Sequence, residues 1–394
     1  MSSRIAIDRP LKVGLNLLFL GERAGGAGRY ATELPGALLA AEPDTEVHVF
    51  VARDAPAQLR GESWAEGVHW VTLPMRAAGS PPELLAQFSV LPAMALWRRL
   101  DVLHSPANTG PTLTPGVASV ISLLDLIWLH RGAEWEPSLR VQRNTRRLIR
   151  HCVRHADRVF AISHDAAEDL ARTLGLSAER IDVTPLGVSL PTGPMTAERK
   201  LREHLDLGNA RVLLCVAQKR PYKNLHRIVQ ALGELEEDVI LVLPGSRTSY
   251  EAELRALAGQ LGLAGRVRFP DWLSEEDLDG LYSLSSAFVL PSLLEGFGLP
   301  ILEAMARELP VACSNVAALP EVAGDAALLF DPERPDEIAA AVRRLLADRS
   351  LAAELIARGR ERVRHYAWRN TGLASLAGYR RAIAGRGLTR RAAI

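Results

Sequence analysis

The chain has 394 residues, of which 48% are hydrophobic and 24% are charged, and its formal net charge at pH 7 is +1. This is the composition of a folded globular protein and excludes a disordered chain. A net charge so close to zero provides no overall attraction to nucleic acid. The length favours two or three domains, each with a hydrophobic core of its own.

Neither the N-terminus nor the cysteines point to secretion. Residues 1–14 lack the apolar core of a signal peptide, and no apolar run reaches the length that spans a membrane. The cysteines are scattered and lie in apolar contexts, so they predict neither disulfides nor a zinc site; they are Cys152, Cys215 and Cys313. We therefore expect a soluble, cytoplasmic protein.

Strands and helices alternate through the first half of the chain. Apolar runs at 12–18 and 46–51 predict strands with a helix over 30–41 between them, and this βαβ order indicates a mostly parallel sheet. We also expect a helix pair over 80–100, and further strands at 101–104, 117–124, 158–163 and 181–188. The fold class is therefore α/β, with doubly wound, Rossmann-like sheets that bind ligands at the carboxyl ends of their strands.

The loop after the first strand contains Gly26 and Gly28, a loose match to the dinucleotide-binding fingerprint. The glycines come several residues after the strand, however, and no acidic residue ends the second strand at the expected spacing. On the residues alone, a flexible loop with a helix cap explains the pattern equally well.

Residues 138–157 predict a helix that is rich in arginine. Apolar residues recur in it at helical spacing, which indicates one buried face. The arginines form either a solvated face or a surface for an acidic acceptor, such as a lipid phosphate or an anionic membrane; they are Arg140, Arg143, Arg146, Arg147, Arg150 and Arg154.

A second sheet is expected to begin with the strand at 211–217. The loop that follows concentrates Lys219, Arg220 and Lys223 before a helix. Cations beside a helix N-terminus suit a diphosphate, because charges and N–H groups together stabilise it. The alternative is a solvated basic loop.

Residues 287–313 predict a strand, a loop, a helix and a second strand. Pro300 marks the helix start. The loop contains Gly296 and Gly298, which leave room for a ligand against the backbone, and the helix N-terminus favours an anion.

Two carboxylates, Glu295 and Glu303, frame this loop, and we place Glu303 in the first helical turn. An ionised carboxylate only accepts hydrogen bonds, so the pair suits a ligand with several hydroxyls. Hydroxyls at both ends and phosphate between them describe a nucleotide sugar. The alternative is that Glu303 complements the helix dipole and Glu295 is merely solvated.

The segment PSLLEGFGLPILEAMA resembles the signature of the retaining glycosyltransferases of family 4. The resemblance extends more weakly over nearly the whole chain. It implies a GT-B architecture: two Rossmann-like domains face a central cleft, and a C-terminal helix crosses back to the first domain. The domains would cover 1–188, with the helix at 366–394, and 189–365.

The resemblance also implies roles for individual residues. Glu295 would bind the donor sugar and Glu303 the ribose of the nucleotide, while the donor would also contact the backbone of Gly296, Phe297, Gly298 and Leu299. Gly26 and Gly28 would approach the donor phosphates and the acceptor. Arg220 and Lys223 would stabilise the leaving diphosphate.

The chain departs from the family at two positions. Tyr222 stands where relatives have an arginine before the Lys-Asn pair, so Lys219 or, preferably, Arg220 would supply the second cation. Leu124 precedes Asp125 where many relatives have His-Asp. Asp125 matches, and we count it among the catalytic candidates. His104 and His130 are candidates for the missing imidazole, although a lone loop histidine is more often structural.

These observations predict an enzyme that moves a hexosyl group, of mannosyl, deoxyhexosyl or glucosyl type, from a nucleotide-diphosphate sugar to an acceptor hydroxyl with retention. The acceptor would be a saccharide, a lipid-linked glycan or a small molecule. We expect no cofactor and no metal ion, and a peripheral contact with an anionic membrane through residues 138–158. The alternatives are a nucleotide-sugar epimerase, an NAD-linked oxidoreductase, or a catalytically silent homologue that binds a partner.

Overall fold

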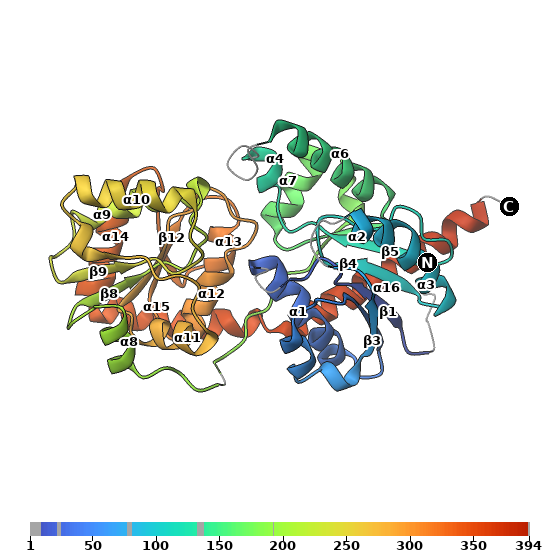
Figure 1. Ribbon diagram of the computed structural model, residues 1–394, viewed down its shortest axis with the longest axis horizontal. Helices are drawn as coiled ribbons and strands as arrows, with labels where there is room; N and C mark the ends of the chain where they lie inside the picture. Colours follow the sequence, from blue (N-terminus) through green and yellow to red (C-terminus); the bar gives the residue numbers. More distant parts are fainter. Residues whose placement is uncertain (1–8, 22–24, 77–80, 132–137, 192, 393–394) are drawn as a thin grey trace. The chain divides into compact units, whose positions relative to one another are not determined.

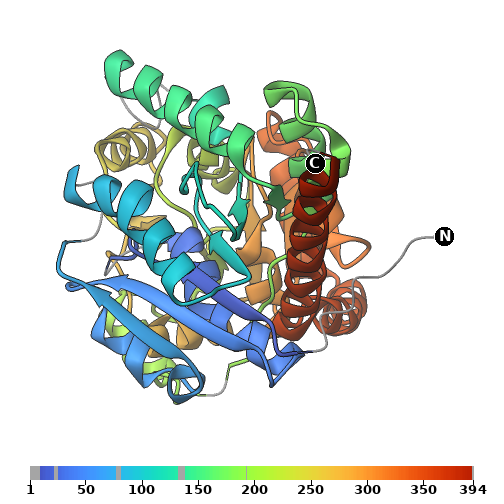
Figure 2. The same cartoon turned by 90° about the vertical axis from the view of Figure 1, so that its right-hand side faces the viewer.

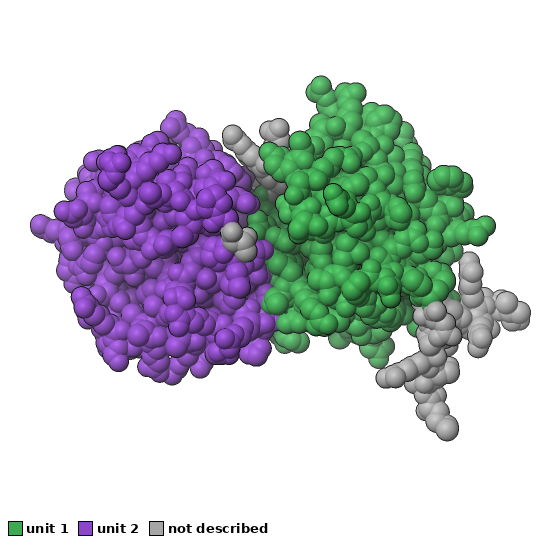
Figure 3. All heavy atoms as spheres, turned by 90° about the horizontal axis from the view of Figure 1, so that it is seen from below, with its two compact units in different colours: residues 1–129, 138–187, 367–394 green, residues 130–137, 188–366 purple. Residues whose placement is uncertain are grey.

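The computed structural model describes residues 9–21, 25–76, 81–131, 138–191 and 193–392. The chain divides into two compact units, coloured separately in Figure 3. Unit 1 comprises residues 1–129, 138–187 and 367–394, and unit 2 comprises residues 130–137 and 188–366. The chain thus leaves unit 1 after Gly187 and returns to it at Ala367, whereas we had expected the first domain to end at 188 and the last helix to begin at 366.

Unit 1 is built on a seven-stranded parallel sheet with the strand order β3-β2-β1-β4-β5-β6-β7. Helices lie on both faces of it (Figure 1), which is why its inner strands are buried along almost their whole length. The strands are β1 (Lys12–Asn16), β2 (Glu46–Ala52), β3 (His69–Leu73), β4 (Val102–Ser105), β5 (Ala118–Ser122), β6 (Arg158–Ala161) and β7 (Ile181–Val183).

The longer helices of unit 1 are α1, α6, α7 and α16, and a broken helix fills residues 81–97. Short 3₁₀ turns lie at Ala57–Gly61, Ala65–Gly67 and Ala178–Arg180. The helix bounds are α1 (Gly25–Ala41), α2 (Pro81–Leu85), the π-helical turn η3 (Ala86–Val90), α3 (Leu91–Trp97), α4 (Ile127–His130), α6 (Leu139–His155), α7 (His164–Leu174) and α16 (Trp368–Ala392).

Helix α16 returns the end of the chain to unit 1, as predicted. Figure 2 shows it as the dark red helix beside the strands of this unit. Gly372 lies so close to the backbone of Ala37 on α1 that no β-carbon fits between the two helices. The helix runs from Trp368 to Ala392, within the range 366–394 expected for it.

Unit 2 contains a six-stranded parallel sheet with the order β10-β9-β8-β11-β12-β13. Its strands are β8 (Arg211–Leu214), β9 (Val239–Val242), β10 (Val267–Arg268), β11 (Ala287–Leu290), β12 (Val311–Ser314) and β13 (Ala327–Phe330). Its helices are α8 (Glu198–His204), α9 (Leu225–Leu232), α10 (Ser249–Gln260), α11 (Glu275–Leu284), α12 (Leu299–Ala306), α13 (Leu319–Ala323), α14 (Pro335–Ala347) and α15 (Arg349–His365), with 3₁₀ turns at Pro221–Lys223 and Ala264–Arg266.

Sequence patterning missed the strands β3 and β13. Both are edge strands and are only partly buried. The apolar residues of β3 are interrupted by Thr72, whereas β13 contains a short apolar run that was not recognised as a strand. Among the helices that the structure describes, none is long and apolar enough to cross a membrane.

A buried hydrogen-bonded cluster joins α16 to the sheet of unit 1. Nδ1 of His104 lies 2.7 Å from the hydroxyl of Tyr379, and Nε2 lies 2.8 Å from Oγ of Ser122. The hydroxyl of Tyr30 is 2.9 Å from the same Ser122 oxygen. Burial lowers the pKa of His104 to about 3 and raises that of Tyr30 to about 12, so both side chains are neutral in the folded protein.

We expect the free energy of unfolding to fall as the pH is lowered from 7 to 5. His104 takes up a proton with an ordinary pKa near 6.5 only when the chain unfolds, so its contribution to stability is complete above that pH and is lost between it and about 3. At pH 5 the loss is about 2 kcal/mol. Urea denaturation at both pH values should show this loss in the parent protein and a clearly smaller one in His104→Gln. Equal pH dependence in the two proteins would contradict the assignment, and the exposed His204→Gln is the control.

Candidate functional site

The candidate site lies at the carboxyl edge of the unit 2 sheet, between β8 and β11. These strands are hydrogen-bonded neighbours, but the chain continues from β8 to one side of the sheet and from β11 to the other. Loops that leave such a pair diverge, which makes this point the usual ligand site of a doubly wound sheet. Lys223 follows β8 and Glu295 follows β11.

Asn224 holds the two loops together. It adopts a left-handed backbone conformation, with φ of 60°, which asparagine tolerates better than most residues. Its buried side-chain amide donates to the carbonyl oxygens of Pro291 at 2.9 Å and Pro332 at 2.7 Å. The main-chain N–H of Leu293 donates to the main-chain carbonyl oxygen of Tyr222 at 2.9 Å.

Lys223 and Glu295 form an ion pair across this junction. Nζ of Lys223 lies 2.6 Å from Oε1 of Glu295, and Oγ of Ser292 donates to the same oxygen at 2.8 Å. The side chains of the pair are largely buried, so the alternative in which Glu295 is merely solvated is wrong. A cation and an oriented hydrogen-bond acceptor therefore lie side by side. The contribution of Ser292, three residues before Glu295, was missed in the sequence.

The glycine loop between Glu295 and α12 is shaped by Gly298. Its φ of 98° is accessible to glycine, and a β-carbon there would lie 2.5 Å from Cδ2 of Leu319. Gly296, Phe297 and Leu299 are buried as well, and the Phe297 ring packs edge-on against Tyr366, with 5.5 Å between the ring centroids. A ligand at this loop would therefore contact main-chain atoms. The helix α12 begins at Leu299, so Pro300 is its second residue and not, as predicted, its first.

Glu303 lies in the second turn of α12, because the helix begins at Leu299; its predicted place in the first turn was wrong. A role as a partner of the helix dipole is correspondingly weakened, since that effect falls off beyond the first turn. The hydroxyl of Tyr282, on α11, donates to Oε2 of Glu303 at 3.1 Å. The Arg307 guanidinium lies 5.0 Å from the centre of the Tyr282 ring and bonds to Asp279. No sequence signal linked Tyr282 to this site.

The structure separates the two candidates for the second cation. Lys219 is completely buried, with Nζ 3.1 Å from Glu251 and a hydrogen bond to the carbonyl oxygen of Gly245. Burial lowers the pKa of Lys219, and the pairing with Glu251 opposes this shift. Lys219 thus joins the loops after β8 and β9, and its proposed contact with a diphosphate is wrong. Arg220 is half-buried and remains the candidate.

The candidate site residues of unit 1 lie on or after strands of the unit 1 sheet. Gly26 and Gly28 lie in the first turn of α1, which starts at Gly25, and Gly26 is exposed. Oδ1 of Asp125 accepts a hydrogen bond from the N–H of Ile127 at 3.0 Å, so this carboxylate shapes the start of α4. His104 belongs to the core and cannot supply the missing imidazole.

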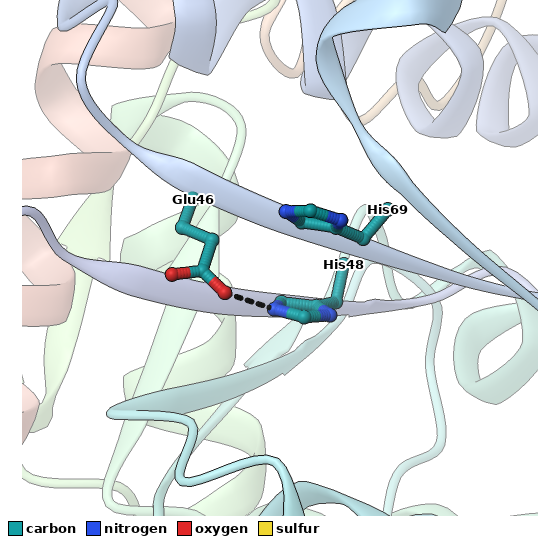
Figure 4. Close-up of side chains that lie close together, drawn as sticks. All are labelled: Glu46, His48 and His69. Atoms are coloured by element: carbon teal, nitrogen blue, oxygen red, sulfur yellow. Dashed lines mark hydrogen bonds and ion pairs between the residues drawn. The ribbon is translucent and has the colours of Figure 1, made fainter.

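One group of histidine and acidic side chains in the described residues has metal-ligand spacing: Glu46, His48 and His69 (Figure 4). Nε2 of His48 is 2.8 Å from Oε1 of Glu46, and the two imidazole rings stack at 4.7 Å. Nζ of Lys12 lies 2.6 Å from Oε2 of Glu46, and Nη1 of Arg98 lies 3.5 Å from Nδ1 of His48. Because arginine can only donate, Nε2 carries the proton that bonds to Glu46. The positive charges of Lys12 and Arg98 would repel a divalent ion, and Nε2 of His48 carries a proton and cannot bind the ion. We therefore assign this group as a hydrogen-bonded side-chain network at the amino ends of β2 and β3.

Residues 197–362 match the family model for glycosyl transferases group 1, and residues 25–187 match that for the glycosyl transferase 4-like domain. The chain belongs to the group 1 glycosyltransferases. This glycosyltransferase is 28% identical to O-antigen chain mannosyltransferase B of Escherichia coli over 370 residues. The matched region covers 90% of this chain and 96% of that protein.

Solved structures identify the fold of the glycosyltransferase. Sucrose-phosphate synthase from Thermosynechococcus elongatus matches with a TM-score of 0.74 and 23% identity, over 95% of this chain and 99% of that one. HepE from Anabaena, in complex with UDP and glucose, matches with a TM-score of 0.68 and 21% identity, over 92% and 97%. The two parallel-sheet units thus form a GT-B fold, as the sequence predicted.

Replacement of Gly298 by alanine should destabilise the glycosyltransferase by at least about 1 to 2 kcal/mol, because a side chain at positive φ is strained and also meets Leu319. Gly259→Ala is the matched control: this glycine is exposed in α10 with open space around it, and alanine there should gain up to about 1 kcal/mol. Denaturation followed by circular dichroism measures both. Equal stability of the two variants would contradict the strained geometry.

Proposed function

We propose that the protein is a retaining hexosyltransferase that uses a nucleotide-diphosphate sugar in glycan, glycolipid or natural-product biosynthesis. The observation that carries this proposal is the pair Lys223 and Glu295, 2.6 Å apart at the switch point of the unit 2 sheet, beside the N-terminus of α12. A diphosphate needs cations and N–H donors, and a sugar needs acceptors for its hydroxyls.

The donor sugar and its ribose are assigned to different carboxylates. Glu295, oriented by Lys223 and Ser292, accepts hydrogen bonds from hydroxyls of the sugar. Glu303, oriented by Tyr282, accepts them from the ribose. The backbone from Gly296 to Leu299 borders the space between them.

The leaving diphosphate is stabilised by Arg220, Lys223 and the first N–H groups of α12. These donors are held in place before the reaction, so they favour the negative charge that develops as the sugar–phosphate bond breaks. We propose that no metal ion is required. The new glycosidic bond forms on the face from which the diphosphate leaves, and the proton of the acceptor hydroxyl passes to a departing phosphate oxygen. Asp125, Gly26 and Gly28 are assigned to the acceptor and the donor phosphates.

The comparisons support a mannosyl group, a polysaccharide acceptor and a nucleotide-sugar donor. The E. coli relative is an O-antigen chain mannosyltransferase, and one structural neighbour was solved with UDP and glucose. We propose that the protein acts in the cytoplasm at the inner face of a membrane, with α6 in contact with anionic lipid.

A nucleoside diphosphate should raise the melting temperature in the absence of metal. A ligand that binds only the folded state at a hundredfold excess over its dissociation constant adds about 2.7 kcal/mol. A thermal-shift screen of GDP, UDP, dTDP, ADP and NAD tests this, with Glu303→Gln expected to weaken the shift and the exposed Glu253→Gln to leave it unchanged. A shift with NAD alone would overturn the proposal in favour of an oxidoreductase.

Glu295→Gln should lower kcat/KM by roughly a hundredfold or more, because the site loses a charged acceptor that is already oriented for the sugar. Transfer of labelled sugar from the donor found in the screen measures the loss, with Glu237→Gln as the control. NMR of the product should show the anomeric configuration of the donor. An unchanged rate in Glu295→Gln would exclude the assigned role, and donor binding without transfer would favour a silent homologue.

A further inference from the structure

The helical segment formed by α2, η3 and α3 exposes an apolar stripe. The largest exposed side chains are Leu85 at 68%, Leu96 at 53% and Trp97 at 75%. Ala93 is also exposed and continues the stripe. The exposed Ser89 lies between Leu85 and Ala93, and its hydroxyl donates to the carbonyl oxygen of Leu85 at 2.6 Å. The single charged residue between 81 and 97, Glu83, is buried.

This pattern is opposite to that of an ordinary surface helix. Helices at the surface of a globular protein carry charged and polar residues outward, whereas the large exposed side chains of this segment are apolar and its one carboxylate, Glu83, is buried. Its inner side packs into the core through Ala86, Leu91 and Ala95. A contiguous apolar stripe that remains exposed indicates an interaction surface.

The arginine-rich helix α6 lies beside this segment. Phe88 of η3 and Leu148 of α6 pack on the same buried cluster, which contains Ile121 and Cys152. Figure 2 shows the two helical segments next to each other in unit 1. The apolar stripe therefore borders a helix of opposite character.

The exposed side of α6 is predominantly basic. The helix contains no acidic residue, and its charged side chains are arginine and histidine. Leu139, exposed at 72%, and Val141 add apolar area at its N-terminal end. The exposed arginines are Arg140, Arg143, Arg147, Arg150 and Arg154.

We propose that these two elements form one docking surface for an anionic lipid bilayer. Leu85, Leu96 and Trp97 enter the boundary between headgroups and acyl chains, and the α6 arginines bind lipid phosphates. Amphipathic surfaces of this kind bind membranes by apolar burial together with attraction to anionic lipid, and tryptophan favours the interface. The purpose, access to a membrane-bound acceptor, rests on the proposed function.

The charges argue against a second copy of the chain as the occupant. A symmetric contact through this surface would place the arginines of one copy against those of the other, with no acid on α6 to pair them. An anionic bilayer supplies the missing negative charge.

The full chain should co-sediment with vesicles containing phosphatidylglycerol and not with vesicles of phosphatidylcholine alone, and added salt should weaken the binding. The triple variant Arg143→Gln, Arg147→Gln, Arg150→Gln should bind at least tenfold more weakly. Its matched control, Arg199→Gln, Arg349→Gln, Arg364→Gln, removes three exposed arginines from unit 2 and should bind like the parent protein.

Insertion is tested by the fluorescence of Trp97. Brominated lipids should quench part of the tryptophan emission in the parent protein, and Trp97→Phe should abolish this quenching. Trp272, which is 52% exposed on unit 2, provides the control: Trp272→Phe should leave the quenching intact. Leu85→Ser with Leu96→Ser should weaken vesicle binding at least tenfold.

Three results would overturn the proposal: equal binding to both kinds of vesicle, unchanged binding of the arginine variant, or concentration-dependent dimerisation of the parent protein that the Leu85 and Leu96 variant abolishes. The nucleotide thermal shift of the arginine variant should equal that of the parent. Loss of vesicle binding with an intact shift therefore separates failure of this surface from failure of the donor site.

Discussion

The side-chain amide of Asn224 is the contact on which the candidate site depends. It joins the loop after β8 to Pro291, after β11, and to Pro332, after β13. Parallel strands bring these loops to one edge of the sheet, but they do not determine how far apart the loops lie. The amide sets that spacing, and it thereby positions Lys223 beside Glu295. Because all three partners are buried, loss of the amide would leave two carbonyl groups without donors.

The same strand order surrounds different chemistry in the two units. In unit 1 the switch point lies between β1 and β4, and it is filled by a neutral network in which Asn16 donates to Ser105 and Gln87 at 3.1 Å each. In unit 2 the corresponding point contains the ion pair. Gln87 comes from η3, whose outward neighbours form the apolar stripe. One helical segment thus connects the carboxyl edge of the unit 1 sheet with the surface that we assign to lipid.

Some residues were predicted correctly because their roles are local. The strand–loop–helix–strand order around Glu295 follows from apolar runs, a proline and two glycines within a short segment. Other predictions failed where residues distant in the sequence determine whether a side chain is buried and what it pairs with. Lys219 resembles its neighbour Arg220 in the sequence, but its side chain is buried. It pairs there with Glu251 of α10 and with the carbonyl oxygen of Gly245 in the loop after β9. His104 was a candidate imidazole until Tyr379 and Ser122 placed it in the core.

The sequence by itself determined the two doubly wound sheets, the family, the basic loop and the paired glutamates, because each depends on patterning within one element or on a contiguous motif. Only the tertiary structure decided the partners of those residues: Lys223 and Ser292 for Glu295, Tyr282 for Glu303, and Asn224 for three loops. It also showed that one helical segment is apolar on its exposed side. The physical reason is that burial and side-chain pairing depend on contacts between residues far apart in the chain, which hydrophobic periodicity does not encode.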